Sequence, residues 1–551
     1  METAFGYQVV AAGVERAGIR TMFGVAGNGS LEIAADFAGR TGCSYVAARH
    51  EAAAINMADG YARRGGGMAA VVVTQGPGLT NGVTALATAA RHHSPLLVFT
   101  GTVPRTSSQW FDQATLADAT GVGFADLDGE RNWGHAVTLA AAEAASTRRP
   151  VVVQVPTSQQ RSAFPLGWPR PAGATAAAIP PDDGDVAGAA DLLGRSTCPV
   201  VLAGRGAVVD SAREPMERLA DRVGALLATT LPAKGLFDGS PFDLGIAGSL
   251  ATPGVRRLLR RADCVVAVGT SLDRRCVGDD ASLIPDATVI HCDHAREVLG
   301  NGFPGRRVPV HGSASRTVRA LLDALPGEPV EPVDGFRNPE VVGELTTLRG
   351  TPRFDAVEGD GLDPRVVMCH LDEALPVQRT VVVDGGHFCG FPAMYLRASA
   401  PTDFLFTLGF GAIGMAVGTA VGASIAAPGR CTVAIVGDGG LMMSLGDLDT
   451  AARYRLPLIV VVLNDNAYGA EVHALRHAGL PSGIAEFDNP SFTGLARALG
   501  LSAGRAADLD EIGRLVADAV HRRTPYLIEV PINGDVLASW YAEDIGLAPI
   551  G

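Results

Sequence analysis

Two aspartates in the last third of the chain have the surroundings expected of metal ligands. Asp438 follows an apolar run at 431–436, and Asp465 follows a second run at 456–463. In a parallel α/β sheet, neighbouring strands end at the same edge, and ligands bind there. Two carboxylates, a loop carbonyl and two phosphate oxygens would make a hard-oxygen set that suits Mg²⁺. The sequence therefore predicts a metal–phosphate site at this edge.

Glycines surround the first of these aspartates, in the sequence Gly437-Asp438-Gly439-Gly440. Glycine allows the backbone to approach a bulky anion, and the helix expected next would offer free N–H groups to phosphate. GDG and NDN could also be ordinary turn residues. The order strand, GDG, helix, strand and NDN favours the functional interpretation.

In this region the chain resembles thiamine diphosphate (ThDP)-dependent enzymes of the acetolactate synthase and pyruvate/benzoylformate decarboxylase group, whose motif is GDG followed by NN. The resemblance implies that Asp438 and Asp465 bind Mg²⁺ together with the backbone carbonyl of Ala467. The family usually has Asn where this chain has Asp465, which adds negative charge beside the diphosphate; a loop shifted by one residue would use Asn464 instead. The motif residues implied to contact the cofactor are Gly437, Asp438, Gly439, Gly440, Asp465, Ala467, Tyr468 and Gly469.

The same resemblance implies an activating glutamate in the first third of the chain. Glu51 stands between a strand pattern at 45–48 and a helical pattern at 52–64. A carboxyl group hydrogen-bonded to N1′ of the aminopyrimidine promotes the imino tautomer that removes the thiazolium C2 proton. Acids are also common in first helical turns without any catalytic role.

Two further loops match the family in kind. In 408–423, LGFGAIGMAVGTAVGA, Ile413 is the large aliphatic residue implied to bend the cofactor, and Gly411 would offer its carbonyl to the 4′-amino group. Tight packing of a small-residue helix is an alternative use of this segment, and both can hold. The diphosphate-side loop would contain Gly386 and His387.

Three residues are candidates for deciding the reaction. Asn28 lies where relatives vary a catalytic residue, although it could be a turn residue; Asn can bind a carboxylate but cannot relay a proton at neutral pH. Glu471 could donate a proton from a dry pocket that raises its pKa, or it could be an exposed helix acid. Gln113 matches an active-site Gln of the acetolactate synthases if one residue of slippage is allowed.

Other side chains have weaker claims. His473, with Phe388, Phe391 and Ala470, is expected to approach the substrate pocket. The pair His92-His93 and the cluster 291–294, HCDH, are interpreted as structural and not as catalytic or metal-binding residues.

The elements that must position these residues form an α/β fold of three domains. Apolar, β-branched runs alternate with helical stretches, which indicates parallel sheets covered by helices. Linker-like seams at 161–184 and 325–364 separate a pyrimidine-binding domain (1–170), a Rossmann-like middle domain (185–330) and a diphosphate-binding domain (360–551). The first and last domains are loosely similar, because each has a glycine-rich turn after a strand.

Composition excludes several classes of protein. The chain has 551 residues, a net charge of −13, 47% hydrophobic residues and 19% charged residues. Such an acidic, apolar chain is neither disordered nor suited to nucleic acid or an anionic membrane. The N-terminus does not have a signal-peptide pattern, and none of the eight cysteines forms a C-x-x-C pair, so we expect a cytoplasmic protein with reduced thiols.

The resemblance implies a ThDP- and Mg²⁺-dependent C–C lyase or ligase, acting as a homodimer or homotetramer. It would decarboxylate a 2-oxo acid and then either protonate the product to an aldehyde or transfer it to an acceptor carbonyl compound. One alternative is a FAD-containing ThDP oxidase or synthase, since some relatives bind FAD in the middle domain. Another is a non-catalytic ThDP-fold binding or regulatory subunit.

Overall fold

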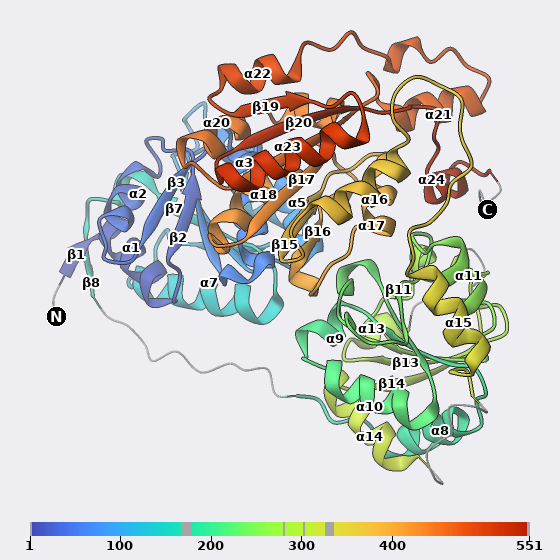
Figure 1. The fold of residues 1–551 in the computed structure, drawn as a ribbon. Helices are drawn as coiled ribbons and strands as arrows, with labels where there is room; N and C mark the ends of the chain where they lie inside the picture. Colours follow the sequence, from blue (N-terminus) through green and yellow to red (C-terminus); the bar gives the residue numbers. More distant parts are fainter. Residues whose placement is uncertain (1–2, 167–177, 279–281, 301–303, 326–334, 548–551) are drawn as a thin grey trace.

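The chain folds into three six-stranded parallel sheets covered by helices, which confirms the predicted α/β class (Figure 1). The computed structural model describes residues 3–166, 178–278, 282–300, 304–325 and 335–547. Most strand interiors are apolar and fully buried, as the continuous β-branched runs predicted. The predicted domain boundaries remain predictions.

The first sheet has the order β3-β2-β4-β5-β7-β6. Its strands are β2 (Thr21–Gly24), β3 (Ser44–Ala47), β4 (Ala69–Val73), β5 (Leu96–Thr102), β6 (Gly123–Asp126) and β7 (Val151–Pro156). Its main helices are α1 (Gly6–Arg16), α2 (Leu31–Ala38), α3 (Glu51–Tyr61), α5 (Val83–His92), α6 (Gln113–Thr120) and α7 (Trp133–Thr147). A short antiparallel pair, β1 (Thr3–Phe5) with β8 (Ala163–Pro165), joins the two ends of this domain.

The third sheet has the order β16-β15-β17-β18-β20-β19. Its strands are β15 (Arg379–Val383), β16 (Phe404–Phe406), β17 (Cys431–Gly437), β18 (Leu458–Asn464), β19 (Ser502–Arg505) and β20 (Tyr526–Pro531). Its helices are α16 (Pro364–Ala374), α17 (Gly390–Tyr395), α18 (Ala416–Ala426), α19 (Asp438–Met443), α20 (Leu445–Arg453), α21 (Gly469–His477), α22 (Phe492–Ala498), α23 (Leu509–Arg522) and α24 (Ser539–Asp544). Counted from one within each domain, the first and third sheets both read 2-1-3-4-6-5. The loose likeness noted in their turns therefore extends to the whole topology.

The middle sheet, β11-β10-β9-β12-β13-β14, reads 3-2-1-4-5-6, which is the Rossmann order. Its strands are β9 (Pro199–Ala203), β10 (Leu226–Thr229), β11 (Asp243–Ile246), β12 (Cys264–Val268), β13 (Thr288–Asp293) and β14 (Arg307–His311). Its larger helices are α8 (Asp183–Gly194), α9 (Arg205–Val209), α10 (Arg213–Val223), α11 (Pro253–Leu259), α14 (Ala314–Ala324) and α15 (Pro339–Leu348). Helix α15 lies in the stretch interpreted as a linker, yet it packs Val341 and Leu345 into the middle-domain core.

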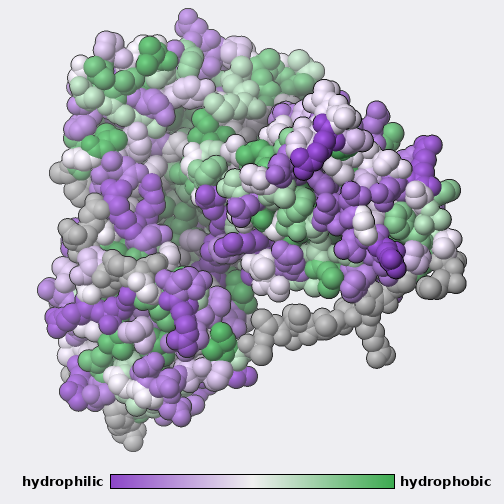
Figure 2. Space-filling view, turned by 180° about the vertical axis from the view of Figure 1, so that it is seen from behind, coloured by the Kyte–Doolittle hydropathy of each residue, from purple (hydrophilic) through white to green (hydrophobic). Residues whose placement is uncertain are grey.

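The first and third domains share one hydrophobic core, whereas the middle domain forms a separate lobe (Figure 2). Helices α3 and α18 cross inside the shared core, where glycines bring their backbones together. A Cβ at Gly60 would overlap the Thr419 carbonyl, and one at Gly422 would overlap the Met57 carbonyl. The small-residue packing considered for 408–423 is therefore present from Ala416 onward. Among the described residues, no helix is both long enough and apolar enough to cross a membrane.

This crossing predicts opposite effects for two Gly→Ala substitutions. Gly422→Ala should lower the free energy of unfolding by about 3 kcal/mol, because no space exists for the methyl group. Gly188→Ala, on exposed α8, meets nothing within 4 Å and should raise it by about 0.5 kcal/mol. Urea unfolding followed by circular dichroism measures both. Equal changes in the two variants would refute the close contact between α3 and α18.

Candidate functional site

The predicted metal and cofactor loops converge at one edge of the third sheet. The strand order reverses between β15 and β17, and ligands of α/β proteins bind at such a switch point. Gly386 and His387 follow β15, Asp438 begins α19 directly after β17, and Asp465 follows β18. Helix α19 has only 6 residues. Because so short a helix has a small dipole, the negative charge of a diphosphate would be balanced better by a cation than by this helix.

Asp438 and Asp465 form a carboxyl pair in which Asp438 is buried and Asp465 is half-buried. Burial raises the pKa of Asp438, and burial together with the charge of Asp438 raises the pKa of Asp465 to about 7. Two like charges held this close repel each other unless a proton or a cation lies between them. Asn489 Nδ2 donates to Asp438 Oδ2 at 2.5 Å and fixes one side of the pair. This donor set suits Mg²⁺, so the residues present fit the implied metal.

The structure favours Asp465 over Asn464 as the second metal ligand. The Asn464 amide is engaged in the loop: Nδ2 donates to Glu529 Oε1 at 3.3 Å, and Oδ1 accepts from the Asn466 backbone N–H at 3.1 Å. Asn466 has a φ of 56°, which places this non-glycine residue in the left-handed region. This sharp turn precedes Ala467, the predicted carbonyl ligand.

The glycines of the first motif are needed for packing inside the protein. A Cβ at Gly439 would overlap the Tyr468 ring, and one at Gly440 would overlap the Asp384 carboxylate. A Cβ at Gly437 would lie 3.1 Å from the Phe388 ring. Anion approach was the reason inferred from the sequence, and the structure adds this second one.

A cavity of about 720 Å³ opens beside the carboxyl pair. Asp465, Ala467 and Gly469 line one side of it, and Arg476 and Arg505 contribute positive charge. This volume lies in the range typical of small-molecule sites. Among the described residues, no group of three or more His, Cys, Asp or Glu side chains could hold a metal alone. The pair therefore needs oxygens from a ligand to complete a metal site.

The loop after β15 lies against the same site. Gly386 has a φ of 127°, which glycine tolerates best. His387 is buried, and burial together with the charge of His473 lowers its pKa to about 3. Ile413 packs against Gly385 of this loop, as a Cβ on that glycine would lie 2.9 Å from Ile413 Cγ2. Gly411, two residues before Ile413, is exposed to solvent and has a φ of 82°. Ile413 therefore lies beside the loop after β15, and its role toward a cofactor stays a prediction.

Glu51 is the first residue of α3 and lies partly exposed at the edge of the first sheet. The His50 side chain caps the helix by accepting from the Ala52 N–H at 3.2 Å. Asn81 Nδ2 donates to Glu51 Oε2 at 3.1 Å. Within the described residues, that is the carboxylate's one hydrogen bond, and it has none with the third-domain loops.

Asn28 and Gln113 lie at the corresponding edge of the first sheet. Asn28 is exposed in the turn after β2, but its φ is not positive, so the left-handed turn conformation considered for an Asn at this position is wrong. Gln113 is buried, and its Nε2 donates to the Gly101 carbonyl at 2.9 Å. Sequence reasoning missed their neighbour Gln75, whose Nε2 donates to Gln109 Oε1 at 3.0 Å. Gln75 lies two residues past the end of β4, which is the strand-end signal that could have identified it.

Helix α21 places the remaining candidates. Glu471 is exposed in its first turn, so the described residues of one chain do not give it the dry pocket that a proton donor needs. The His473 ring lies 4.8 Å from that of His387 in an edge-on arrangement. Ala470 accepts a hydrogen bond from Tyr541 Oη at 2.8 Å. His473 and Ala470 therefore lie beside the loop after β15, as expected of pocket residues.

Several other residues have structural roles. Phe388 and Phe391 are buried in the third-domain core. His291 Nε2 donates to the Thr270 carbonyl at 2.8 Å within the middle domain, and His294 is exposed. His92 is buried beside Asp59, with Nδ1 2.9 Å from its Oδ2.

The chain matches three family models. They are described as thiamine pyrophosphate enzyme N-terminal TPP binding domain (residues 5–123), central domain (186–321) and C-terminal TPP binding domain (384–530). It is 29% identical to a probable acetolactate synthase large subunit of Methanocaldococcus jannaschii, covering 96% of this chain and 92% of that protein. It is 27% identical to the acetolactate synthase isozyme 3 large subunit of Escherichia coli, covering 97% and 96%.

The carboxyl pair predicts how Asp465→Asn changes the protein without its cofactor. Removing one charge relieves the repulsion, so the thermal midpoint of the apo protein should rise. Affinity for Mg²⁺ alone should fall about ten-fold, because ligand charge sets the affinity for hard cations. Differential scanning calorimetry and calorimetric titration with MgCl₂ measure these effects. Asp488→Asn, which neutralises an exposed acid lining the same cavity, should change neither. Equal effects in both variants would contradict the assignment of the pair.

Proposed function

Because the chain belongs to the thiamine pyrophosphate enzyme family, we propose that it is a ThDP- and Mg²⁺-dependent enzyme that joins two carbonyl compounds after decarboxylating a 2-oxo acid. The observation that carries this proposal is the Asp438–Asp465 carboxyl pair at the switch point of the third sheet, where the pKa of Asp465 is raised to about 7 by burial and by the charge of Asp438. Relatives named acetolactate synthases, aligned over nearly the whole chain, support the reaction class.

Asp438, Asp465 and the Ala467 carbonyl would hold Mg²⁺, and the metal would bind the diphosphate beside the cavity. The Gly411 carbonyl would accept a hydrogen bond from the aminopyrimidine, and Ile413 would support the bend of the cofactor. When bound, ThDP supplies a nucleophilic carbon that adds to the keto group and takes up the electrons released with CO₂. The protein's part is to hold this carbon, exclude water and move protons.

We further propose a homodimer or homotetramer in which Glu51 faces a cofactor held by a second copy. Within one chain its carboxylate bonds Asn81 and reaches no cofactor loop among the described residues. Phe410 and Met443, close in sequence to the cofactor loops, leave 47% and 57% of their surface exposed. A second copy would cover these apolar side chains and complete the site. The free cysteines support the cytoplasmic location inferred from the sequence.

Ligation is favoured over protonation of the product. Protonation was suggested by Glu471, but within one chain that carboxyl is exposed, so only burial by the second copy would make it a proton donor. The titratable side chains beside the loop after β15 are His387 and His473, and burial lowers the pKa of both. Uncharged imidazoles leave an acceptor carbonyl compound free to compete with protonation.

The test is incubation with a panel of 2-oxo acids, with and without acceptor aldehydes and ketones, followed by mass spectrometry. Acyloin or acetohydroxy acid products that require both ThDP and Mg²⁺ are expected. If only aldehydes are formed, the reaction is simple decarboxylation and the ligation proposal is wrong. A visible flavin absorption with oxygen consumption would favour the oxidase alternative. ThDP binding without turnover on any substrate would favour the non-catalytic alternative.

Glu51→Gln should retain ThDP and Mg²⁺ but lose turnover by about 100-fold or more, because the amide cannot exchange a proton with the aminopyrimidine. Steady-state kinetics and calorimetric ThDP titration separate these effects. Glu32→Gln, an acid on α2 paired with Arg161, is the matched control and should keep full turnover. Full activity of Glu51→Gln would contradict the assigned role.

A further inference from the structure

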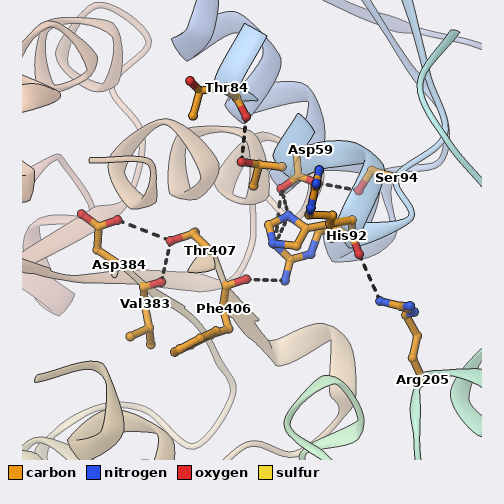
Figure 3. A network of polar contacts seen from close by, with 12 residues as sticks. Asp59, Thr84, His92, Ser94, Arg205, Val383, Asp384, Phe406 and Thr407 are labelled. Atoms are coloured by element: carbon orange, nitrogen blue, oxygen red, sulfur yellow. Dashed lines mark hydrogen bonds and ion pairs between the residues drawn. The ribbon is translucent and has the colours of Figure 1, made fainter. Parts of the chain in front are cut away.

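The loop 406–415, which contains the predicted cofactor contacts, is anchored by its own domain at one side. Asp384 accepts hydrogen bonds from the backbone N–H groups of Gly414 at 2.9 Å and Met415 at 3.1 Å. Thr407 Oγ1 donates to the Val383 carbonyl at 2.9 Å (Figure 3). These bonds fix both ends of the loop to Val383 and Asp384, at the carboxyl end of β15.

The first domain anchors the same loop from the other side. Arg63 Nη2, just past the end of α3, donates to the Phe406 carbonyl at 2.9 Å. The His92 ring, at the end of α5, fills the space over Gly409, where a Cβ would lie 2.7 Å from both Nε2 and Cδ2. Two side chains of the first domain therefore determine where the loop can lie.

These two side chains are held by a buried carboxylate, Asp59 (Figure 3). It accepts from Ser94 Oγ at 2.5 Å and Arg63 Nη1 at 3.3 Å, and His92 Nδ1 lies 2.9 Å away. Burial alone would raise the pKa of Asp59, but His92, Arg63 and Ser94 outweigh it and lower the pKa. Burial lowers the pKa of His92, and a hydrogen on Nδ1 is what its contact with the carboxylate requires, because a carboxylate only accepts. Among the described residues, its Nε2 has no hydrogen-bond partner and instead faces the loop.

The middle domain also touches this cluster, since Arg205 Nη1 donates to the Arg91 carbonyl at 3.4 Å. The Arg91 guanidinium in turn stacks 4.1 Å over the Phe410 ring. The loop is thus contacted at Phe406, Gly409 and Phe410 by residues outside its own domain.

We propose that Arg63 and His92 are positioning residues for the cofactor: by locating loop 406–415 they set the Gly411 carbonyl and Ile413 against it. This inference rests on the proposed function. Displacing a reacting group by 1 Å can cost about 100-fold in rate, so a loosened loop should slow proton removal from the cofactor more than it weakens substrate binding.

The chain provides a matched pair of arginines for the test. Arg64 is as buried as Arg63, with 14% and 18% of their side chains exposed, and it also joins the first and third domains. Its Nε donates to Thr380 Oγ1 at 2.8 Å, and its guanidinium pairs with Asp403 at 3.4 Å. It has no hydrogen bond to loop 406–415 among the described residues. Arg64→Gln therefore removes a comparable interdomain contact and leaves the loop anchored.

The experiment measures hydrogen–deuterium exchange at C2 of bound ThDP, by quenching in acid and recording proton NMR spectra, in holoenzyme carrying Arg63→Gln or Arg64→Gln. Arg63→Gln should slow exchange by about ten-fold or more and lower kcat, with the KM for the 2-oxo acid unchanged. Arg64→Gln should lower the thermal midpoint similarly while exchange stays close to that of the unsubstituted protein. Equal slowing in both variants, or none in Arg63→Gln, would overturn the proposal.

Gly409→Ala gives a second test that removes no buried charge. Its methyl group would push the loop away from His92, so the same loss of exchange is expected with little change in the unfolding transition. Unchanged exchange in this variant would overturn the proposal. If the unsubstituted protein itself shows no cofactor-dependent exchange, the proposed function fails as well, which separates the two failures.

Discussion

The backbone contact between α3 and α18 is the constraint on which the rest of the site depends. Gly60 and Gly422 let each helix lie against a carbonyl of the other, so the first and third domains share one core and keep a fixed relation. Helix α3 begins at Glu51, and α18 begins just after the loop containing Ile413. The two functional segments therefore start from the ends of one rigid helix pair.

The electrostatics of the Asp438–Asp465 pair explain why the third-domain part of the site is incomplete without a ligand. Burying two carboxylates side by side is unfavourable, and the raised pKa values of Asp438 and Asp465 express that cost. Asn489 supplies a neutral donor and cannot cancel the charge. A divalent cation that arrives with a diphosphate would satisfy the same groups, with Asp438 and Asp465 as its protein ligands.

The sequence predicted the parts of this arrangement that follow local rules. Strand ends mark Asp438, Asp465 and Glu51, because apolar runs locate the strands and parallel strands end at one edge. Asn489 could not be found this way, since it reaches Asp438 from a loop with no strand-end motif. His92 was interpreted as structural, and its contact with Gly409 depends on how two domains pack, which a single sequence does not show.

One helix connects these separate features. Glu51 lies at the first turn of α3 and Asp59 in its last turn, with Arg63 just beyond. The first end presents Glu51, the proposed activating acid, at the surface where we propose that a second copy binds, while the other end, through Arg63 and His92, contacts loop 406–415 of its own chain. In a homodimer, a shift of α3 along α18 would therefore disturb two cofactors at once. The glycine contacts that forbid such a shift serve the chemistry as well as the stability of the fold.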